Sequence, residues 1–306
     1  MLRLLLSLLF VLAAAPDLHA EKRIGVIMTG DIPYYGVMHQ AFAAELNSRF
    51  AGGEKVEIIL QRPFPNPISW SNAARKLIAF DVDLIVTYGS PATQAVIHER
   101  SRIPLVYAGV YDTGQEVIAA EKTTGCGFKI PLSSIVRYIK RLKPVDTLGI
   151  VFNSMEEDSV RQYKTMVEVA EQQGMKALEI DIRSRADLDK LKAAKPDAVF
   201  ITGSSLAHLW LEEILMILRK EQIPAVDIFP DDSSAGVLLS LYQPPLAQGQ
   251  MAAEMVAKIL RGGEKPASIA PHIFRDTELV FNLVSARDLG ITFPIQMISE
   301  ATRVIK

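Results

Sequence analysis

The chain has 306 residues, of which 49% are hydrophobic and 22% charged, with a formal net charge of −2 and a single cysteine. A nucleic-acid-binding surface needs a basic face, which this charge balance disfavours. One cysteine allows no internal disulfide, so packing must supply the stability. We expect Cys126, which lies between two glycines, to be a buried small apolar residue. A reactive thiol is the alternative.

The first 20 residues have the layout of a secretory signal peptide. Arg3 precedes an apolar run over residues 4–15, and Leu18-His19-Ala20 places a small residue just before Glu21. The run is shorter than the roughly 20 residues that span a bilayer, which disfavours a transmembrane anchor. We therefore predict cleavage after Ala20 and a mature periplasmic protein that does not insert into the membrane.

Short apolar strands alternate with helical segments in the first part of the mature chain. One predicted helix carries Met38, Phe42 and Leu46 on a single face. The strands are apolar along most of their length, which is typical of a parallel sheet covered on both faces. Strands are predicted at 23–28, 56–61, 84–88 and 104–108, and further helices at 68–80 and 91–100.

The same alternation then restarts, so two successive βα arrays of the doubly wound kind are predicted. The strands of the second array are expected at 148–152, 177–182, 198–202 and 225–229, and its helices at 157–173, 185–194 and 205–221.

The remaining residues supply too few elements for a third domain. They include a strand at 236–242, a helix that ends near Arg261-Gly262-Gly263, a strand at 278–284 and a last helix with Ile295, Ile298, Ala301 and Ile305 on one side. These elements must complete the two lobes already present, so the chain has to cross between the lobes more than once.

The predicted fold class is therefore α/β, with two doubly wound parallel-sheet lobes joined by a multi-strand hinge. We expect residues 21–124 with 243–276 to form the N-terminal lobe, and residues 125–242 with 277–306 to form the C-terminal lobe.

Ligands of open parallel sheets bind beyond the carboxyl ends of the strands. In this chain those ends are followed by small and polar residues, and two such edges facing each other would form a polar cleft. The candidate ligand-binding residues are Asp31, Tyr34, Tyr35, Ser90, Ala92, Thr93, Tyr111, Asp112, Asn153, Glu156, Ser159, Ser204, Ser205 and Asp231.

The turn Gly89-Ser90-Pro91-Ala92-Thr93 is the most informative of these edges. Ser90 suits a helix N-cap and Pro91 the first helical position. The N–H groups of Ala92 and Thr93 would then favour an anion such as an α-carboxylate. Plain helix capping is an equally good interpretation of the same residues.

The other candidates each have two interpretations. Tyr34 and Tyr35 would stack on a ring-bearing ligand or simply pack at a loop. Asp112 and Glu156 would pair with a ligand ammonium, because a buried cation needs a carboxylate partner. As surface carboxylates they would instead be solvated or serve as helix-start charges, and this is the expectation for Glu157 and Asp158.

Enzymatic interpretations find little support. Neither a GxxxxGK[ST] nor a GxSxG motif occurs, and Gly125-Cys126-Gly127 lacks the third glycine of a dinucleotide loop. The five histidines are scattered, with no H-x-x-H or H-E-x-x-H spacing. We therefore expect no catalytic residue, no metal site and no cofactor.

Several segments carry a resemblance to a known family. They are Gly89 to Ala95, Ile103 to Gly109 with Asp112, Thr124 to Gly127, Leu148 to Asn153 with Glu156 and Ser159, Gly249 to Ala253, Leu260 to Gly262, Phe281-Asn282 and Ala286 to Pro294. In this order and spacing the chain resembles ABC transporter substrate-binding proteins whose better-known members bind tryptophan or other aromatic amino acids.

The resemblance implies a type I periplasmic-binding fold, with the ligand held between the Ser90–Thr93 and Asn153–Ser159 turns. It also implies delivery of an amino-acid-like, possibly aromatic, small molecule to an ABC permease in the inner membrane. Gly203-Ser204-Ser205 replaces an Asp common in the family, and the segment Gly30 to Tyr35 also differs; both differences fall at the expected cleft. A ligand-sensing module for a membrane receptor is the alternative function, and an exported enzyme a weaker one.

Overall fold

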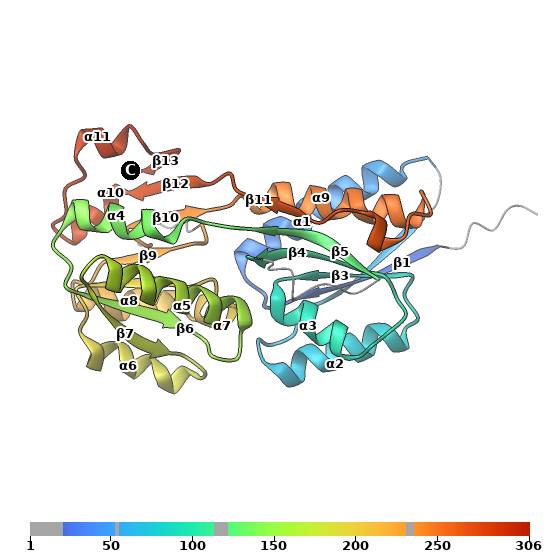
Figure 1. Cartoon of the computed structure of the whole chain (residues 1–306), viewed down its shortest axis with the longest axis horizontal. Coiled ribbons are helices and arrows are strands. Elements are labelled where there is room, and N and C mark those ends of the chain that lie inside the picture. Colours follow the sequence, from blue (N-terminus) through green and yellow to red (C-terminus); the bar gives the residue numbers. More distant parts are fainter. Residues whose placement is uncertain (1–20, 53–54, 113–121, 231–235) are drawn as a thin grey trace, which may run out of the picture.

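The computed structural model describes residues 21–52, 55–112, 122–230 and 236–306. The predicted signal peptide and the candidate Asp231 lie outside these residues. The chain forms two α/β lobes side by side (Figure 1). Among the described residues, none of the helices combines the length and hydropathy that a bilayer crossing requires.

The first lobe is built on a six-stranded parallel sheet with the order β11-β5-β4-β3-β1-β2. Its apolar strands are covered on both faces, as their composition predicts. Its strands are β1 (Lys22–Met28), β2 (Val56–Gln61), β3 (Leu84–Tyr88), β4 (Leu105–Tyr111), β5 (Thr123–Phe128) and β11 (His272–Phe274). Its helices are α1 (Pro33–Phe50), α2 (Pro67–Ala79), α3 (Ser90–His98), α9 (Pro245–Leu260) and the 3-10 turn η2 (Pro266–Ser268).

The second lobe is built on a seven-stranded sheet with the order β13-β12-β10-β9-β8-β6-β7, parallel except for the antiparallel pair β10 and β12. Its strands are β6 (Thr147–Phe152), β7 (Lys176–Asp181), β8 (Ala198–Ile201), β9 (Ala225–Asp227), β10 (Leu239–Tyr242), β12 (Glu278–Asn282) and β13 (Arg303–Ile305). Its helices are α4 (Leu132–Leu142), α5 (Glu157–Gln172), η1 (Arg185–Leu188), α6 (Asp189–Ala194), α7 (Ser205–Leu209), α8 (Leu211–Lys220), α10 (Leu283–Asp288) and α11 (Ile295–Ile298).

The chain crosses between the lobes three times, after β5, after β10 and after β11 (Figure 1). The multi-strand hinge is therefore present. The lobe boundary expected at 124/125 falls inside β5, which belongs to the first sheet. The division into lobes remains our proposal, with the first crossing placed after Phe128.

Several elements differ from the prediction. Two short edge strands, β11 and β13, and the glycine-containing β5 were not expected as strands. The last predicted helix breaks into α11 and β13, because its apolar residues are shared between a helical turn and a strand that pairs with β12. The predicted helix 205–221 breaks at Trp210 into α7 and α8.

The packing of α9 along α1 closes the first lobe. A Cβ on Gly249 would collide with the backbone oxygen of Met38 and come within 2.9 Å of the Phe42 nitrogen. Glycine at this position therefore allows the two helix backbones to approach closely. The largest buried apolar cluster includes residues of both lobes, with Tyr34 and Phe229 among them.

Candidate ligand-binding site between the lobes

The carboxyl ends of the two sheets face each other, and side chains from both lobes meet there. The Tyr34 ring, at the start of α1 in the first lobe, stacks on Phe229, which follows β9 in the second lobe. Their centroids are 4.0 Å apart and their planes 11° from parallel. Both rings are buried. We call the region where the lobes touch the lobe interface; it is closed in this structure.

The N-terminus of α3 makes the polar contact across the lobe interface. The backbone N–H of Ser90 donates to Oδ2 of Asp158 at 2.9 Å, from the first turn of α5. Arg161 Nη2 donates to the other Asp158 oxygen, to Ser90 Oγ at 3.3 Å and to the Tyr111 carbonyl at 3.2 Å. The Asp158 carboxylate and the Arg161 guanidinium of the second lobe thus bind two segments of the first lobe, the start of α3 and the end of β4.

Asp158 was expected to be solvated or to serve as a helix-start charge. It does lie in the first turn of α5, but it is not solvated. Its side chain is only 8% exposed, whereas that of Glu157 is 52% exposed, as predicted for a surface carboxylate. Burial raises the pKa of Asp158 to about 6, although Arg161 and the Ser90 N–H favour the ionised form.

The Glu156 carboxylate makes its hydrogen bonds within the second lobe. Its carboxylate accepts hydrogen bonds from Asn153 Nδ2 (2.9 Å), Ser204 Oγ (2.8 Å), Ser205 N (2.7 Å) and Leu206 N (3.0 Å). It therefore ties the β6–α5 turn to the start of α7. Burial raises the pKa of Glu156, and these four donors oppose the rise.

His208 and Asp227 form a buried pair behind Phe229. His208 Nδ1 lies 2.8 Å from the Ser204 carbonyl, and Nε2 lies 2.9 Å from Asp227 Oδ2. Asp227 Oδ1 accepts the N–H groups of Ile228 and Phe229. Both ring nitrogens therefore face oxygen atoms, and only the protonated imidazole donates to both of them at once. Burial alone would lower the pKa of His208, but the Asp227 carboxylate raises it overall.

Two buried polar atoms at the lobe interface lack a hydrogen-bond partner among the described residues, Ser205 Oγ and Arg161 Nε. Ser205 is fully buried and lies against Gly30 of the first lobe. Burial raises the pKa of Tyr35 well above its usual range, and the Ser205 hydroxyl slightly opposes this, which makes the two hydroxyls neighbours.

The remaining predicted residues fall into two groups. Ala92 N–H donates to Thr29 Oγ1 and Thr93 N–H to the Gly89 carbonyl, so both are used within the first lobe. Ser159 Oγ lies 2.7 Å from Thr202 Oγ1 and so supports the β6–α5 turn from within the second lobe. The Asp31 and Asp112 side chains are 55% and 43% exposed and pair with Arg62 and Lys129.

The helix start differs from the predicted one by a residue. Gly89 is the N-cap of α3, with φ 87°, and Ser90 is already helical. A Cβ at Gly89 would collide with the Tyr35 hydroxyl, so glycine is required there both by conformation and by space. Because Ser90 is the first helical residue, its N–H is free to point at the second lobe.

Sequence reasoning missed Asp158, Arg161, His208, Asp227 and Phe229 as site residues. The i, i+3 spacing of Asp158 and Arg161 indicates an ion pair on one helix face. Phe229 ends the predicted strand 225–229, so its place at a carboxyl edge was a usable signal.

Cys126 is buried, as predicted, and its thiol donates to the Gln248 carbonyl at 3.4 Å. Burial raises the pKa of this thiol. Among the described residues, no group of three or more His, Cys, Asp or Glu side chains could hold a metal ion.

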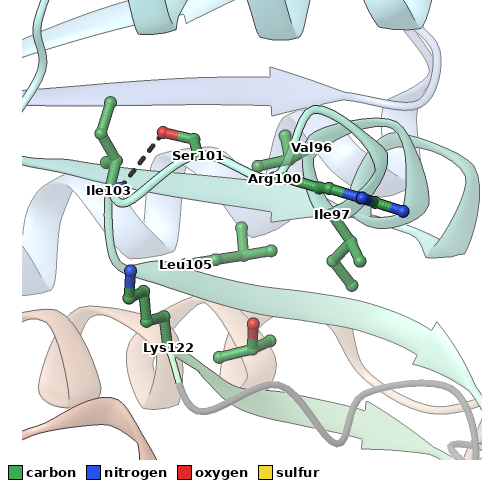
Figure 2. Close-up of a pocket in the computed structure, with 8 residues that line it drawn as sticks. Val96, Ile97, Arg100, Ser101, Ile103, Leu105 and Lys122 are labelled. Carbon is green, nitrogen blue, oxygen red and sulfur yellow. Dashed lines mark hydrogen bonds between the residues drawn. The ribbon is translucent and has the colours of Figure 1, made fainter.

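A separate cavity of about 310 Å³ lies at the other end of the first sheet (Figure 2). It is formed where α3 ends and where β4 and β5 begin. Apolar side chains including Val96, Ile97 and Leu105 line it, with Arg100 and Lys122 at its edge. It is thus far from the carboxyl edges at which the lobes meet.

Comparison with known proteins agrees with this architecture. The family model described as "ABC transporter substrate binding protein" matches residues 54–305. The chain therefore belongs to the family of ABC transporter substrate-binding proteins, and its partners are a small-molecule ligand and an ABC transporter. The search of curated proteins found no match.

Solved structures show the type I periplasmic-binding fold. An ABC domain in complex with L-Trp from Streptococcus pneumonia is 22% identical, with a TM-score of 0.86 over 94% of this chain and 100% of that one. A conserved domain protein from Vibrio cholerae is 23% identical, with a TM-score of 0.86 over 92% and 99%. The ligand-free, open structure of a Clostridium difficile substrate-binding protein with adhesive properties is 21% identical, with a TM-score of 0.64 over 93% and 99%.

Proposed function

We propose that this protein is an exported solute-binding protein that captures an aromatic amino acid between its lobes and delivers it to an ABC permease in the inner membrane. The predicted signal peptide supports a periplasmic location. The site we propose has no catalytic role, since the groups at the lobe interface are hydrogen-bond partners and aromatic faces.

The stacked pair of Tyr34 and Phe229 is the observation that carries the choice of ligand. Each lobe contributes one aromatic face, and the two faces are parallel. An opening of the lobes by about one ring thickness, roughly 3.5 Å, would let a planar ring enter between them. The ring of the ligand would then replace the contact that the two side chains make with each other.

Polar groups beside this pair would hold the main chain of such a ligand. The Ser90 N–H at the start of α3 and the Arg161 guanidinium favour a carboxylate. The Ser205 and Tyr35 hydroxyls, one from each lobe, lie next to each other and would receive an ammonium. The L-Trp bound to the similar Streptococcus domain agrees with this class of ligand.

Equilibrium titration tests the ligand class. L-Tryptophan, L-phenylalanine, L-leucine, L-rhamnose and myo-inositol are added in turn, with calorimetry and the fluorescence of Trp70 as readouts. Trp70 donates its indole N–H to the Thr29 carbonyl at 2.7 Å, at the carboxyl end of β1, so it senses the first-lobe edge.

We expect saturable binding of the aromatic amino acids and weaker binding of leucine, which lacks a ring to stack. The two sugars are included because similar folds bind L-rhamnose and myo-inositol. Tighter binding of a sugar than of any amino acid would overturn the proposed ligand while leaving the fold and family unchanged.

A further inference from the structure

We propose that the Asp158 carboxylate is an internal substitute for the acidic group of the ligand: it holds the lobes closed without ligand, and the carboxylate of the ligand displaces it. The second half of this inference rests on the proposed function. The first half concerns the protein alone.

Asp158 occupies the position that an anionic ligand would choose. Its Oδ2 accepts the Ser90 N–H at the start of α3, a helix of nine residues. Its Oδ1 accepts from Arg161. A helix N-terminus and an arginine are the two groups that most often bind carboxylates in proteins. Arg161 lies on the same helix as Asp158, whereas the Ser90 N–H belongs to the opposite lobe, so the contact with Ser90 exists only while the lobes are closed.

Asp158 binds only part of the Arg161 guanidinium. The Nε–H and one Nη2–H of a guanidinium point the same way and bind a carboxylate with two parallel hydrogen bonds. Here Nη2 is engaged, whereas Nε is buried without a partner among the described residues. A free carboxylate, which is not tethered to α5, would satisfy both donors.

The Ser205 hydroxyl lies beside the same turn. It is fully buried on the second lobe and is a neighbour of the Tyr35 hydroxyl, which lies against Gly89 at the start of α3. Because the two hydroxyls belong to different lobes, opening the lobes would separate them beside the turn that Asp158 contacts.

The charges around Asp158 make its competition depend on pH. The groups that act on it are Arg161 and Glu157 on its own helix, with Tyr34, Tyr35 and Tyr111 opposite. Its pKa of about 6 means that the internal carboxylate is ionised at pH 8 and largely neutral at pH 5. The α-carboxylate of L-tryptophan stays ionised at both values, so L-tryptophan should bind more tightly at pH 5.

The experiment compares the wild-type protein with Asp158→Asn and Asp158→Ala, and with Asp189→Asn as a matched control on an exposed site of α6. Thermal unfolding first establishes that each variant is folded. Small-angle X-ray scattering without ligand then gives the radius of gyration. Calorimetry at pH 5 and pH 8 measures binding of three probes: L-tryptophan, indole-3-propionate and tryptamine.

We expect both Asp158 variants to be more open than the wild type without ligand. We also expect them to bind L-tryptophan and indole-3-propionate roughly tenfold more tightly at pH 8, because a charged hydrogen-bond competitor is removed. Their affinity should change less between pH 5 and pH 8 than that of the wild type. Tryptamine, which has no carboxylate, should not gain affinity.

A radius of gyration that is the same in the Asp158 variants and the wild type would overturn the proposal that Asp158 holds the lobes closed. Weaker binding of L-tryptophan and tryptamine by the variants would overturn the competition and assign Asp158 to the ammonium of the ligand. If no probe binds any form, the proposed aromatic ligand and the competition fail together, whereas scattering still decides whether Asp158 holds the lobes closed.

Discussion

At the scale of single residues, the charge state of the closed form depends on His208. Both of its ring nitrogens face oxygen atoms, those of the Ser204 carbonyl and the Asp227 carboxylate, and the other Asp227 oxygen accepts two backbone N–H groups. The imidazolium therefore holds the turn that presents Phe229 to the first lobe. Glu156 adds a second negative charge that favours the protonated ring.

This pair predicts a stability that falls as the pH rises. The pKa of His208 is higher in the folded protein than its ordinary value of about 6.5, so its contribution is complete below that pH and is lost as the pH passes the raised pKa. His208→Gln should lower the free energy of unfolding by about 3 kcal/mol at pH 6, since it leaves a buried charge unpaired. Urea unfolding at pH 6 and pH 9 measures this.

The difference between wild type and His208→Gln should shrink at pH 9. His98→Gln, on an exposed position of α3, is the control and should change neither value. A difference that is equal at both pH values would mean that His208 is neutral in the folded protein.

At the scale of elements, the contact between α1 and α9 determines the shape of the first lobe. Only hydrogen fits at Gly249, because the backbone of α1 lies directly against it. The start of α9 also supports the site, since Gln248 donates to the Tyr34 hydroxyl at 2.8 Å and accepts from the Gly109 N–H at 2.9 Å.

Gly249→Ala should therefore destabilise the protein by about 2 kcal/mol, the usual cost of forcing an extra carbon into a close-packed contact. Gly36→Ala in α1 is the matched control, because a Cβ there meets nothing within 4 Å. That change should be neutral or stabilising by up to about 1 kcal/mol. Thermal unfolding of both variants distinguishes these outcomes, and equal effects would contradict the close packing of the two helices.

At the scale of the whole molecule, closure joins two lobes that each have their own sheet. The lobes are linked by three crossings and touch through Tyr34 with Phe229 and through Ser90 with Asp158. A ligand can change the ratio of open to closed forms only through contacts that it makes better in one of them. The side-chain contacts between the lobes therefore set the ratio of open to closed forms without ligand, and this ratio affects the affinity for any ligand.

Phe229→Ala should favour the open form. Loss of a stacked aromatic pair removes about 0.5–1.5 kcal/mol beyond the buried area, which is roughly a two- to tenfold change in the ratio of closed to open molecules. Small-angle scattering of the ligand-free protein should show a larger radius of gyration. Phe64→Ala, at a side chain that is 51% exposed, should leave it unchanged. An unaltered radius in the Phe229 variant would show that stacking does not hold the lobes together.

The sequence by itself determined most of the architecture of this protein. Apolar runs such as 84–88 and 148–152 are long enough and uniform enough to form only buried parallel strands, and polar residues that follow them mark the carboxyl edges. The two-lobe α/β class, the edge that carries the site and the buried state of Cys126 all follow from such local patterns. Short edge strands such as β13 did not, since three residues hold too little pattern.

The tertiary structure alone decided which polar residues face the other lobe. Asp158 and Glu157 are neighbours with the same charge and both accept a hydrogen bond from Ser90, yet Asp158 is buried and Glu157 is exposed. Glu156 turns inward to four donors that lie about 50 residues away in sequence or in its own turn. Such roles depend on distances between segments that meet only after folding, and no local periodicity records them.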